Sequence, residues 1–407
     1  MKHFLFRKNA LCSGIILFPV MVMIFSCRGP GRESGLPDQD VISNQLHLLD
    51  KNVQNVAGEA SATGGGFEGI VPRTVGEDGT LVLVNGGDWT SGFYPGILWQ
   101  MYELTGEKSW RDRAEFYTQK LESQQYNNSD HDIGFRMFCS YGNAFRLTGK
   151  EEYIPVLVRS ARTLISRYYE KVGCIRSWDF NQDVWQCPVI IDNMMNLELL
   201  FWASEKTGDP RFHDIAVQHA LTTMENHFRE DYSTCHVVDY DTINGQVRQK
   251  NTHQGYADGS SWARGQAWGL YGYTMTYRYT KDNRFLRQAE GIADFILGHP
   301  NLPDDGIPYW DFDAPGMPDE PRDVSAAAIM ASALYELSTY SEKGTVYRKE
   351  ADRILKNIWN GYRSGNGENC GFLLDHSVGS KPENREVDVP LIYADYYFLE
   401  AMVRKNK

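Results

Sequence analysis

The sequence has few cysteines, and their spacing matches neither a metal site nor a disulfide framework. None of the seven belongs to a Cys-x-x-Cys pair or stands at zinc-ligand spacing from a histidine. Cys12 and Cys27 fall within or at the end of an N-terminal apolar segment, which leaves five, an odd number. We expect these five to be buried or loop thiols.

Positive charge is also in short supply. The chain carries 41 Lys and Arg against 53 Asp and Glu, a formal net charge of −12. Nucleic-acid binding requires cations that replace phosphate counterions, so this balance argues against a nucleic-acid partner. It leaves a small anionic ligand possible, because a few converging cations can reverse the field locally.

Long apolar runs are scarce as well. One of them, residues 15–25, follows a basic start and is too short for an ordinary membrane-spanning helix. We interpret residues 1–26 as a signal peptide. Ser26 before Cys27 fits a lipoprotein cleavage site with Cys27 as the lipidated first residue, although Phe25 is bulky for such a site. Plain secretion, with Cys27 unmodified, is the alternative.

The rest of the chain divides simply. Residues 27–40 are interpreted as a flexible tether and 41–407 as a single domain, since 42% apolar residues can bury a large core. Lipidation would hold that domain at a membrane face outside the cytoplasm. Residues 28–32 carry no acidic side chain, which favours the periplasmic face of the outer membrane. The membrane is expected as a partner only through this anchor, and no protein partner is inferred.

What the sequence does contain is helical periodicity. Apolar stripes with the period of an α-helix predict about twelve helices and a nearly all-α protein, whereas strand-like alternation is brief. The stripes lie near residues 41–58, 91–105, 110–126, 133–148, 152–169, 193–206, 211–228, 263–280, 284–298, 324–339, 345–361 and 389–403.

A weak repeat pairs these helices. Gly106, Gly149 and Gly208 each follow one stripe and precede the next after a short turn, as C-capping glycines do. The first member of a pair, such as 92–99, is apolar all round, and the second, such as 107–124, is amphipathic. Six hairpins could form an open solenoid or a ring. Buried inner helices covered by half-exposed outer ones favour the ring, an (α/α)6 toroid or double-layered helical barrel.

Polar and aromatic residues cluster at the predicted starts of the inner helices. In a toroid these starts share one end, so they would converge, and helix N-termini favour an anionic ligand. An Asp at a helix start is often only an N-cap, and the abundant aromatics (13%) could serve a helical core instead of sugar stacking. Capping does not account for the accompanying histidines and tryptophans. The clusters are Asp88-Trp89-Thr90, His131-Asp132, Asp192-Asn193, and Trp262 with Arg264 and Gln266.

Five motifs in order carry a resemblance to glycoside hydrolase family 88, the unsaturated glucuronyl hydrolases. The likeness extends over essentially the whole chain after the tether. The motifs are WTSGFYPG at 89–96, HDIGF at 131–135, IDNMMN at 191–196, QGYAD at 254–258 leading into SWARGQAW at 261–268, and YADYY at 393–397.

The resemblance implies an unusual hydrolysis. The substrate would be an oligosaccharide ending in the 4,5-unsaturated uronic acid that a polysaccharide lyase leaves, whose ring contains a vinyl ether. By motif position Asp192 would protonate C4 and activate the water that adds at C5. Asp132 would hold sugar hydroxyls, and repulsion between the two carboxylates would raise one pKa. No cofactor and no metal are implied.

The same resemblance assigns substrate-binding roles to further residues. His236 and Gln254 would line the reacting face, Arg264 and Trp268 would seat the uronate, and His131 would bond a hydroxyl or orient Asp132. The others expected to bind substrate are Trp89 and Trp178, by stacking on sugar rings, and Ser377, Ser380 and Lys381. Those last three lie in a predicted loop, 376–382, that would contact a sulfated amino sugar; an ordinary solvated loop is the alternative.

Three functions remain open on the sequence alone. The first is release of the unsaturated uronate from glycosaminoglycan-derived oligosaccharides. The second is an unsaturated rhamnogalacturonyl hydrolase acting on pectin fragments, which shares the fold and parts of the pattern. The third is a lipid-anchored sugar-binding protein without catalysis. Asp132 and Asp192 both stand intact in their motifs, which favours an enzyme.

Overall fold

Two layers of helices alternate along the chain, as the periodicity predicts. The computed structural model describes residues 37–62 and 70–407, so the predicted signal peptide, Cys27 and most of the predicted tether lie outside the described residues. The inner layer is α2 (Phe93–Thr105), the broken helix α4, η2 and α5 (Ile133–Met137, Phe138–Gly142, Asn143–Thr148), η3 and α7 (Ile191–Asn196, Leu197–Thr207), α9 (Ala263–Thr280), α11 (Val324–Leu337) and α13 (Ile392–Lys405).

The outer layer consists of the more amphipathic helices. Most of them cover an inner helix with the apolar stripe and expose the polar side: α10 (Asn283–Gly298) buries Phe285, Ala289 and Ile292 while Arg284 stays exposed. The outer helices are α1 (Gln39–Ala62), α3 (Lys108–Lys120) continued by η1 (Glu122–Tyr126), α6 (Tyr153–Ile165), α8 (Pro210–His227), α10 (Asn283–Gly298) and α12 (Gly344–Gly361).

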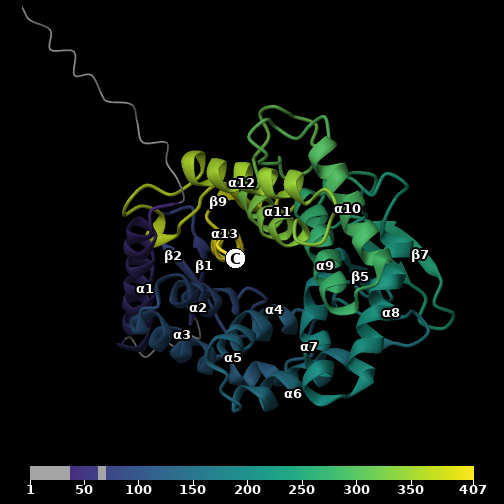
Figure 1. Cartoon of the computed structure of the whole chain (residues 1–407), viewed down its shortest axis with the longest axis horizontal. Coiled ribbons are helices and arrows are strands. Elements are labelled where there is room, and N and C mark those ends of the chain that lie inside the picture. The colour runs from purple at the N-terminus through teal and green to yellow at the C-terminus, as the bar shows by residue number, and fades with distance from the viewer. Residues whose placement is uncertain (1–36, 63–69) are drawn as a thin grey trace, which may run out of the picture. The chain divides into compact units, whose positions relative to one another are not determined.

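The inner helices close into a ring. Within residues 37–407, contacts run from α2 to η2, from α4 to η3, from η3 to α9, from α9 to α11, from α11 to α13, and from α13 back to α2 (Figure 1). The (α/α)6 toroid is thereby confirmed and the open solenoid is wrong. None of the described helices is both long and apolar enough to cross a bilayer.

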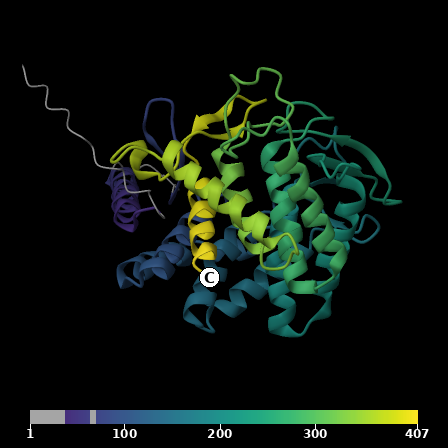
Figure 2. The same ribbon diagram turned by 45° about the horizontal axis from the view of Figure 1, so that its top comes forward.

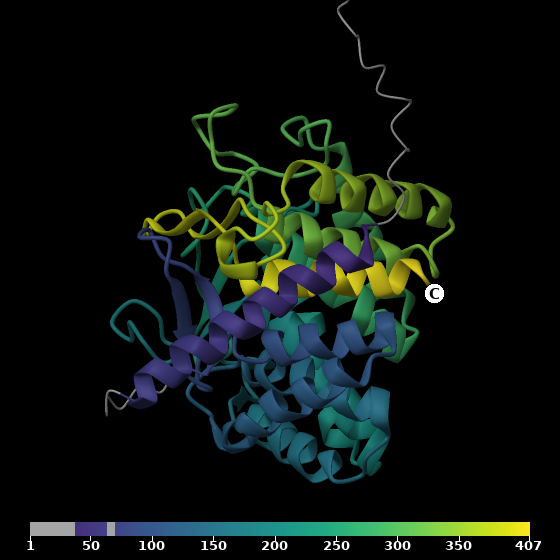
Figure 3. The ribbon, with the colours of Figure 1, turned by 90° about the vertical axis from the view of Figure 1, so that its left-hand side faces the viewer.

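The helix α1 joins the two ends of the ring. It runs diagonally along one side of the helical layers (Figure 3) and contacts η4 (Asn369–Gly371), which follows the last outer helix. Gln45 carries much of this junction, because its amide donates to Glu368 O at 2.9 Å and Phe372 O at 3.1 Å. Its carbonyl oxygen accepts from Gly367 N at 3.0 Å.

The predicted C-caps are present. Gly106, Gly149 and Gly208 adopt left-handed φ values of 72°, 66° and 71°, and each backbone N–H bonds to a carbonyl of the preceding turn. The short turns that follow allow the next helix to return antiparallel.

Short strands gather where the inner helices begin, because each β segment in the described chain precedes an inner helix (Figure 2). The sheets are β1 (Val71–Val75) with β2 (Leu81–Val84), β3 (Tyr168–Tyr169) with β4 (Cys174–Ile175), β5 (Pro188–Ile190) with β6 (Val237–Tyr240) and β7 (Val247–Asn251), and β8 (Ser377–Ser380) with β9 (Arg385–Val389); all pairs are antiparallel. The predicted loop 376–382 was therefore wrong in part: four of its residues form β8, paired with β9.

Candidate active site

A cavity of about 550 Å³ lies at the end of the ring where the inner helices start. It contains most of the residues that the motifs predicted, although they come from segments more than 170 residues apart in the chain. The predicted residues in its wall are Trp89, His131, Asp132, Trp178, Asp192, Gln254 and Arg264.

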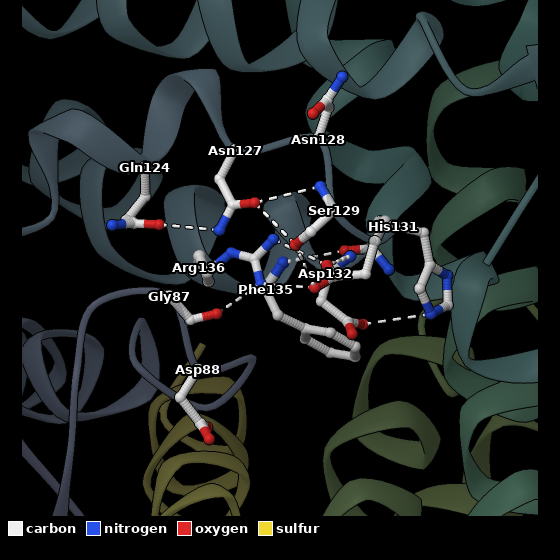
Figure 4. A network of polar contacts seen from close by, with 12 residues as sticks. Gly87, Asp88, Gln124, Asn127, Asn128, Ser129, His131, Asp132, Phe135 and Arg136 are labelled. Atoms are coloured by element: carbon white, nitrogen blue, oxygen red, sulfur yellow. Dashed lines mark hydrogen bonds and ion pairs between the residues drawn. The ribbon is translucent and has the colours of Figure 1, made fainter. Parts of the chain in front are cut away.

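Asp132 lies in the turn that leads into α4, and it does not cap that helix. Its carboxylate contacts His131 Nε2 at 3.3 Å, and the two side chains face each other in Figure 4. Burial, followed by the negative charges of Asp130 and Asp192, raises the pKa of Asp132 well above its ordinary value. Burial lowers the pKa of His131 to about 3, so this imidazole is neutral.

The ion pair of Asp130 and Arg136, which the sequence analysis missed, holds the backbone at Asp132 in place. Asp130 lines the cavity, accepts from the Asp132 backbone N–H at 2.8 Å and pairs with Arg136 at 2.7 Å. The buried guanidinium of Arg136 also donates to Gly87 O at 3.0 Å, which ties α4 to the turn before α2 (Figure 4). The sequence signal that could have indicated this role is the position of Asp130, two residues before the motif aspartate Asp132.

Asp192 stands in η3, the short helix that precedes α7, and it makes no capping bond. Burial raises its pKa to about 7, and the opposing charge of Arg264 and the neighbouring Trp268 indole limit the rise. The structure thus places both motif carboxylates in one cavity without a capping role. Burial is the main cause of both raised pKa values. The charge of Asp192 adds to the rise at Asp132, which agrees with the predicted repulsion between the two carboxylates.

His236, the residue directly before β6, approaches Asp192. Its Nδ1 accepts backbone N–H bonds from His253 and Gln254, both at 3.1 Å. The ring hydrogen must therefore sit on Nε2, which faces Asp192 Oδ2 at 3.7 Å. Burial holds the pKa of His236 well below its usual value, so the ring is neutral beside the carboxylate.

The cationic side of the cavity is Arg264, at the start of α9. Its guanidinium donates to Gly379 O at 2.6 Å, and the Gln254 amide donates to the same carbonyl at 3.0 Å. These bonds attach both predicted binding residues to the β8–β9 hairpin. Trp262 and Tyr393 cover the guanidinium, with ring centroids 4.6 and 5.4 Å from its central carbon.

Aromatic side chains form the remaining walls. Trp178 stacks on Phe180 with centroids 4.8 Å apart, and Phe180 is 48% exposed. Trp89 packs edge-on against Phe135 at 5.5 Å. Trp268 is fully buried, lies outside the cavity wall and packs on Phe135 at 5.3 Å. Its role would thus be to support the wall and to act on Asp192.

The predicted sulfate-binding residues occupy a different place. Ser377 and Ser380 are buried in β8, and Lys381 begins the turn that follows. None of the three lines the cavity. The same hairpin instead supplies Arg385, which lines the cavity with a side chain 57% exposed. Sequence reasoning assigned no role to Arg385 or to the other aromatic or charged wall residues, Asp130, Phe135, Asp179, Phe180 and His253.

A second cavity of about 310 Å³ lies along the same ring, near the other ends of the inner helices. Phe135 lines both cavities. Trp268 packs on Phe135 and on Tyr397, the latter with centroids 5.4 Å apart. Aromatic rings therefore separate the two cavities.

Among the described residues, no group of three or more His, Cys, Asp or Glu side chains is arranged to hold a metal ion. The five cysteines of this part of the chain are free, and Cys174, Cys187 and Cys235 are buried.

A closed ring of six helical hairpins with two acidic groups at one end is an architecture of sugar-cleaving enzymes, and the chain belongs to one such family. Residues 74–289 match the model of Glycosyl Hydrolase Family 88. An unsaturated glucuronyl hydrolase of Formosa agariphila is 48% identical over 368 residues, which cover 88% of this chain and 92% of that protein. An unsaturated chondroitin disaccharide hydrolase of Streptococcus pneumoniae is 31% identical and covers 84% of this chain and 87% of that protein.

Solved structures agree. An unsaturated glucuronyl hydrolase specific for heparin superposes with a TM-score of 0.84 at 48% identity, covering 90% of this chain and 96% of that one. The enzyme of a Bacillus species, responsible for the degradation of glycosaminoglycan, gives a TM-score of 0.80 at 29% identity, with the same coverage.

Proposed function

We propose that this glycosidase releases the 4,5-unsaturated uronic acid from the non-reducing end of glycosaminoglycan-derived oligosaccharides. One observation carries the proposal: Asp132 and Asp192 share a cavity in which burial raises the pKa of Asp192 to about 7. A carboxyl group with that pKa can hold a proton near neutral pH and give it up during the reaction.

The chemistry follows from those two groups. Asp192 protonates C4 of the ring double bond, and the resulting carboxylate takes a proton from the water that adds at C5. The hemiketal then opens and the glycosidic bond breaks. Asp132, held by His131 and Asp130, binds the sugar hydroxyls next to the reacting carbons. The neutral Nε2–H of His236 faces Asp192 and stabilises its carboxylate.

The substrate side combines one buried cation with aromatic walls. Arg264 attracts the uronate carboxylate, while Trp89 and Trp178 contact the apolar faces of the sugar rings. Arg385, at the exposed rim, provides a cation for a negatively charged group on the second sugar. Ser377, Ser380 and Lys381 contribute through the hairpin that carries Arg385.

Disaccharides from defined lyases test this function. The relative of known heparin specificity shares 48% of its sequence with this chain, against 31% for a chondroitin-type relative. We therefore expect faster turnover of heparin-derived than of chondroitin-derived unsaturated disaccharides, followed as loss of the conjugated-acid absorbance. Asp192→Asn should lower kcat/KM by about 10²–10⁴-fold. Full activity of that variant, or turnover of unsaturated pectin fragments alone, would contradict the proposal.

We also propose export and anchoring. The signal-like segment at 1–26 and Ser26-Cys27 support a lipoprotein held by Cys27 on the periplasmic side of the outer membrane. There it would receive small oligosaccharides from lyases. Labelled palmitate should enter the expressed protein but not its Cys27→Ser variant; equal labelling of both would contradict the anchor.

A further inference from the structure

Asp323 is a fully buried carboxylate that lies outside the cavity wall and precedes α11. Its two oxygens have different partners. Oδ1 accepts from Ser325 N at 3.1 Å and Ser325 Oγ at 2.6 Å, as an N-cap does, and from Val378 N of β8 at 3.4 Å. Oδ2 contacts Arg264 Nη1 at 3.1 Å.

The guanidinium of Arg264 is held on every side by neighbouring groups. Besides Asp323, its guanidinium bonds to the carbonyls of Val378 and Gly379, and it lies between the rings of Trp262 and Tyr393. Only the carboxylate among these partners carries a full negative charge. A buried guanidinium needs such a charge to hold a single orientation, because backbone carbonyls alone leave its charge unbalanced.

We propose that Asp323 is a positioning residue for the reaction: it orients Arg264 for the uronate carboxylate and locks the β8–β9 hairpin against the start of α11. The inference rests on the proposed function. Asp323 accepts a hydrogen bond from Val378 N, and thereby fixes the strand β8, whose carbonyls accept bonds from Arg264 and Gln254. One buried carboxylate thereby sets the cationic side of the cavity.

The obvious alternative is that Asp323 only caps α11. Asp323→Asn separates the two roles, because an Asn carbonyl can keep the Oδ1 bonds while its amide replaces Oδ2 and repels the guanidinium. Asp323→Ser also retains a capping hydroxyl and lacks the charge. Ser325→Ala is the matched control, since it removes a partner of Oδ1 and leaves the Arg264 pair intact.

The experiment is a double-mutant cycle with Arg264→Gln, measuring kcat and KM on the best unsaturated disaccharide. We expect Asp323→Asn to lower kcat/KM by about 100-fold, as loss of a productive orientation does, with most of the loss in KM. In the Arg264→Gln background the same change should cost nothing further. Ser325→Ala should behave like the parent.

The outcomes that overturn the inference are distinct. Equal losses in both backgrounds, or parent-like kinetics of Asp323→Asn and Asp323→Ser, would remove the positioning role. Failure of both variants to fold, judged by thermal unfolding, would make Asp323 a structural residue and overturn it too. A parent without turnover on any unsaturated disaccharide would contradict the proposed function instead.

Discussion

At the scale of the residue, the proton affinity of Asp192 is set by where the carboxyl group lies. Its side chain is 14% exposed, and burial raises its pKa from 3.8 to about 7. The same burial that prepares a proton donor costs stability once the group ionises. If Asp192 is the proton donor, as proposed, both its function and its contribution to stability decline as pH rises through about 7.

The Asp192→Asn variant tests how the raised pKa of Asp192 makes stability depend on pH. In the parent, the folded state binds the proton more tightly than the unfolded chain, so stability is fully present below pH 3.8 and falls as pH rises through about 7. The loss is up to roughly 4 kcal/mol for a shift of this size. The Asn variant has no such loss. Urea unfolding should show its advantage over the parent growing from pH 5 to pH 8.5.

The matched control is Asp282→Asn. Asp282 caps α10, and the bonds from Arg284 hold its pKa below the ordinary value. It is ionised in both states across that pH range, so the effect of its replacement should not change with pH. An advantage of the Asp192 variant that stays constant with pH would contradict the raised pKa.

Sequence reasoning at this scale succeeded where motifs were contiguous and failed where distant segments meet. Trp89, Asp132, Asp192, Gln254 and Arg264 all fall in the cavity wall. Arg385 does not follow from its neighbours in sequence, because only the pairing of β9 with β8 brings it to the cavity. The burial of Ser377 and Ser380 has the same cause, because it follows from the pairing of β8 with β9. No local sequence pattern predicts that burial.

At the scale of the element, close packing sets the spacing of the two carboxylates. Gly134, two residues after Asp132, touches Asn196 at the end of η3. A Cβ on Gly134 would lie 2.4 Å from Asn196 Oδ1 and 2.6 Å from its Cα, closer than atoms can approach. The helix α4 and the segment that carries Asp192 can be this close only because position 134 has no side chain.

Gly134→Ala should therefore force α4 and η3 apart. We expect a loss of about 1–3 kcal/mol of stability from overpacking, and a loss of about 100-fold in kcat/KM from a displacement near 1 Å. Gly361→Ala is the control: it ends α12, where an added Cβ meets nothing within 4 Å. Helix propensity should make that variant slightly more stable. Parent-like activity of Gly134→Ala would show that the separation is not critical.

Helices were predictable and strands were not, for a physical reason. A helix such as α10 repeats its apolar stripe over 16 residues, with an Asp cap before it. The strand β8 has four residues, all buried, preceded by His376 in a left-handed conformation with φ of 61°. Four buried residues show no alternation, so the strand cannot be recognised before its partner is known.

At the scale of the whole molecule, the ring depends on a junction between the first helix and a loop more than 300 residues later. Gln45 bonds to four backbone groups of that loop through its single amide. Replacement with Ala removes these bonds and leaves the buried carbonyl of Phe372 without this partner. The ring closure should weaken while the cavity, which Gln45 does not line, keeps its geometry.

Gln45→Ala should lower the free energy of unfolding by about 2–4 kcal/mol, with kcat/KM near the parent value at low temperature. Urea unfolding and initial rates measure the two effects. Gln54→Ala, on the same helix, removes an exposed side chain bonded to Asp50 and should change little. A stability loss equal to that of the control would mean that α1 is not needed to close the ring.

The aromatic partition between the two cavities also determines how the enzyme handles polymers. Phe135 lines both cavities, and Trp268 packs on Phe135 and on Tyr397, so we expect these rings to prevent a polysaccharide from threading through the ring. The incoming terminus and both products would then use one opening, and the remaining chain would withdraw after each cleavage. On the proposed function, lyases that cut internally would multiply the chain ends that this protein can reach.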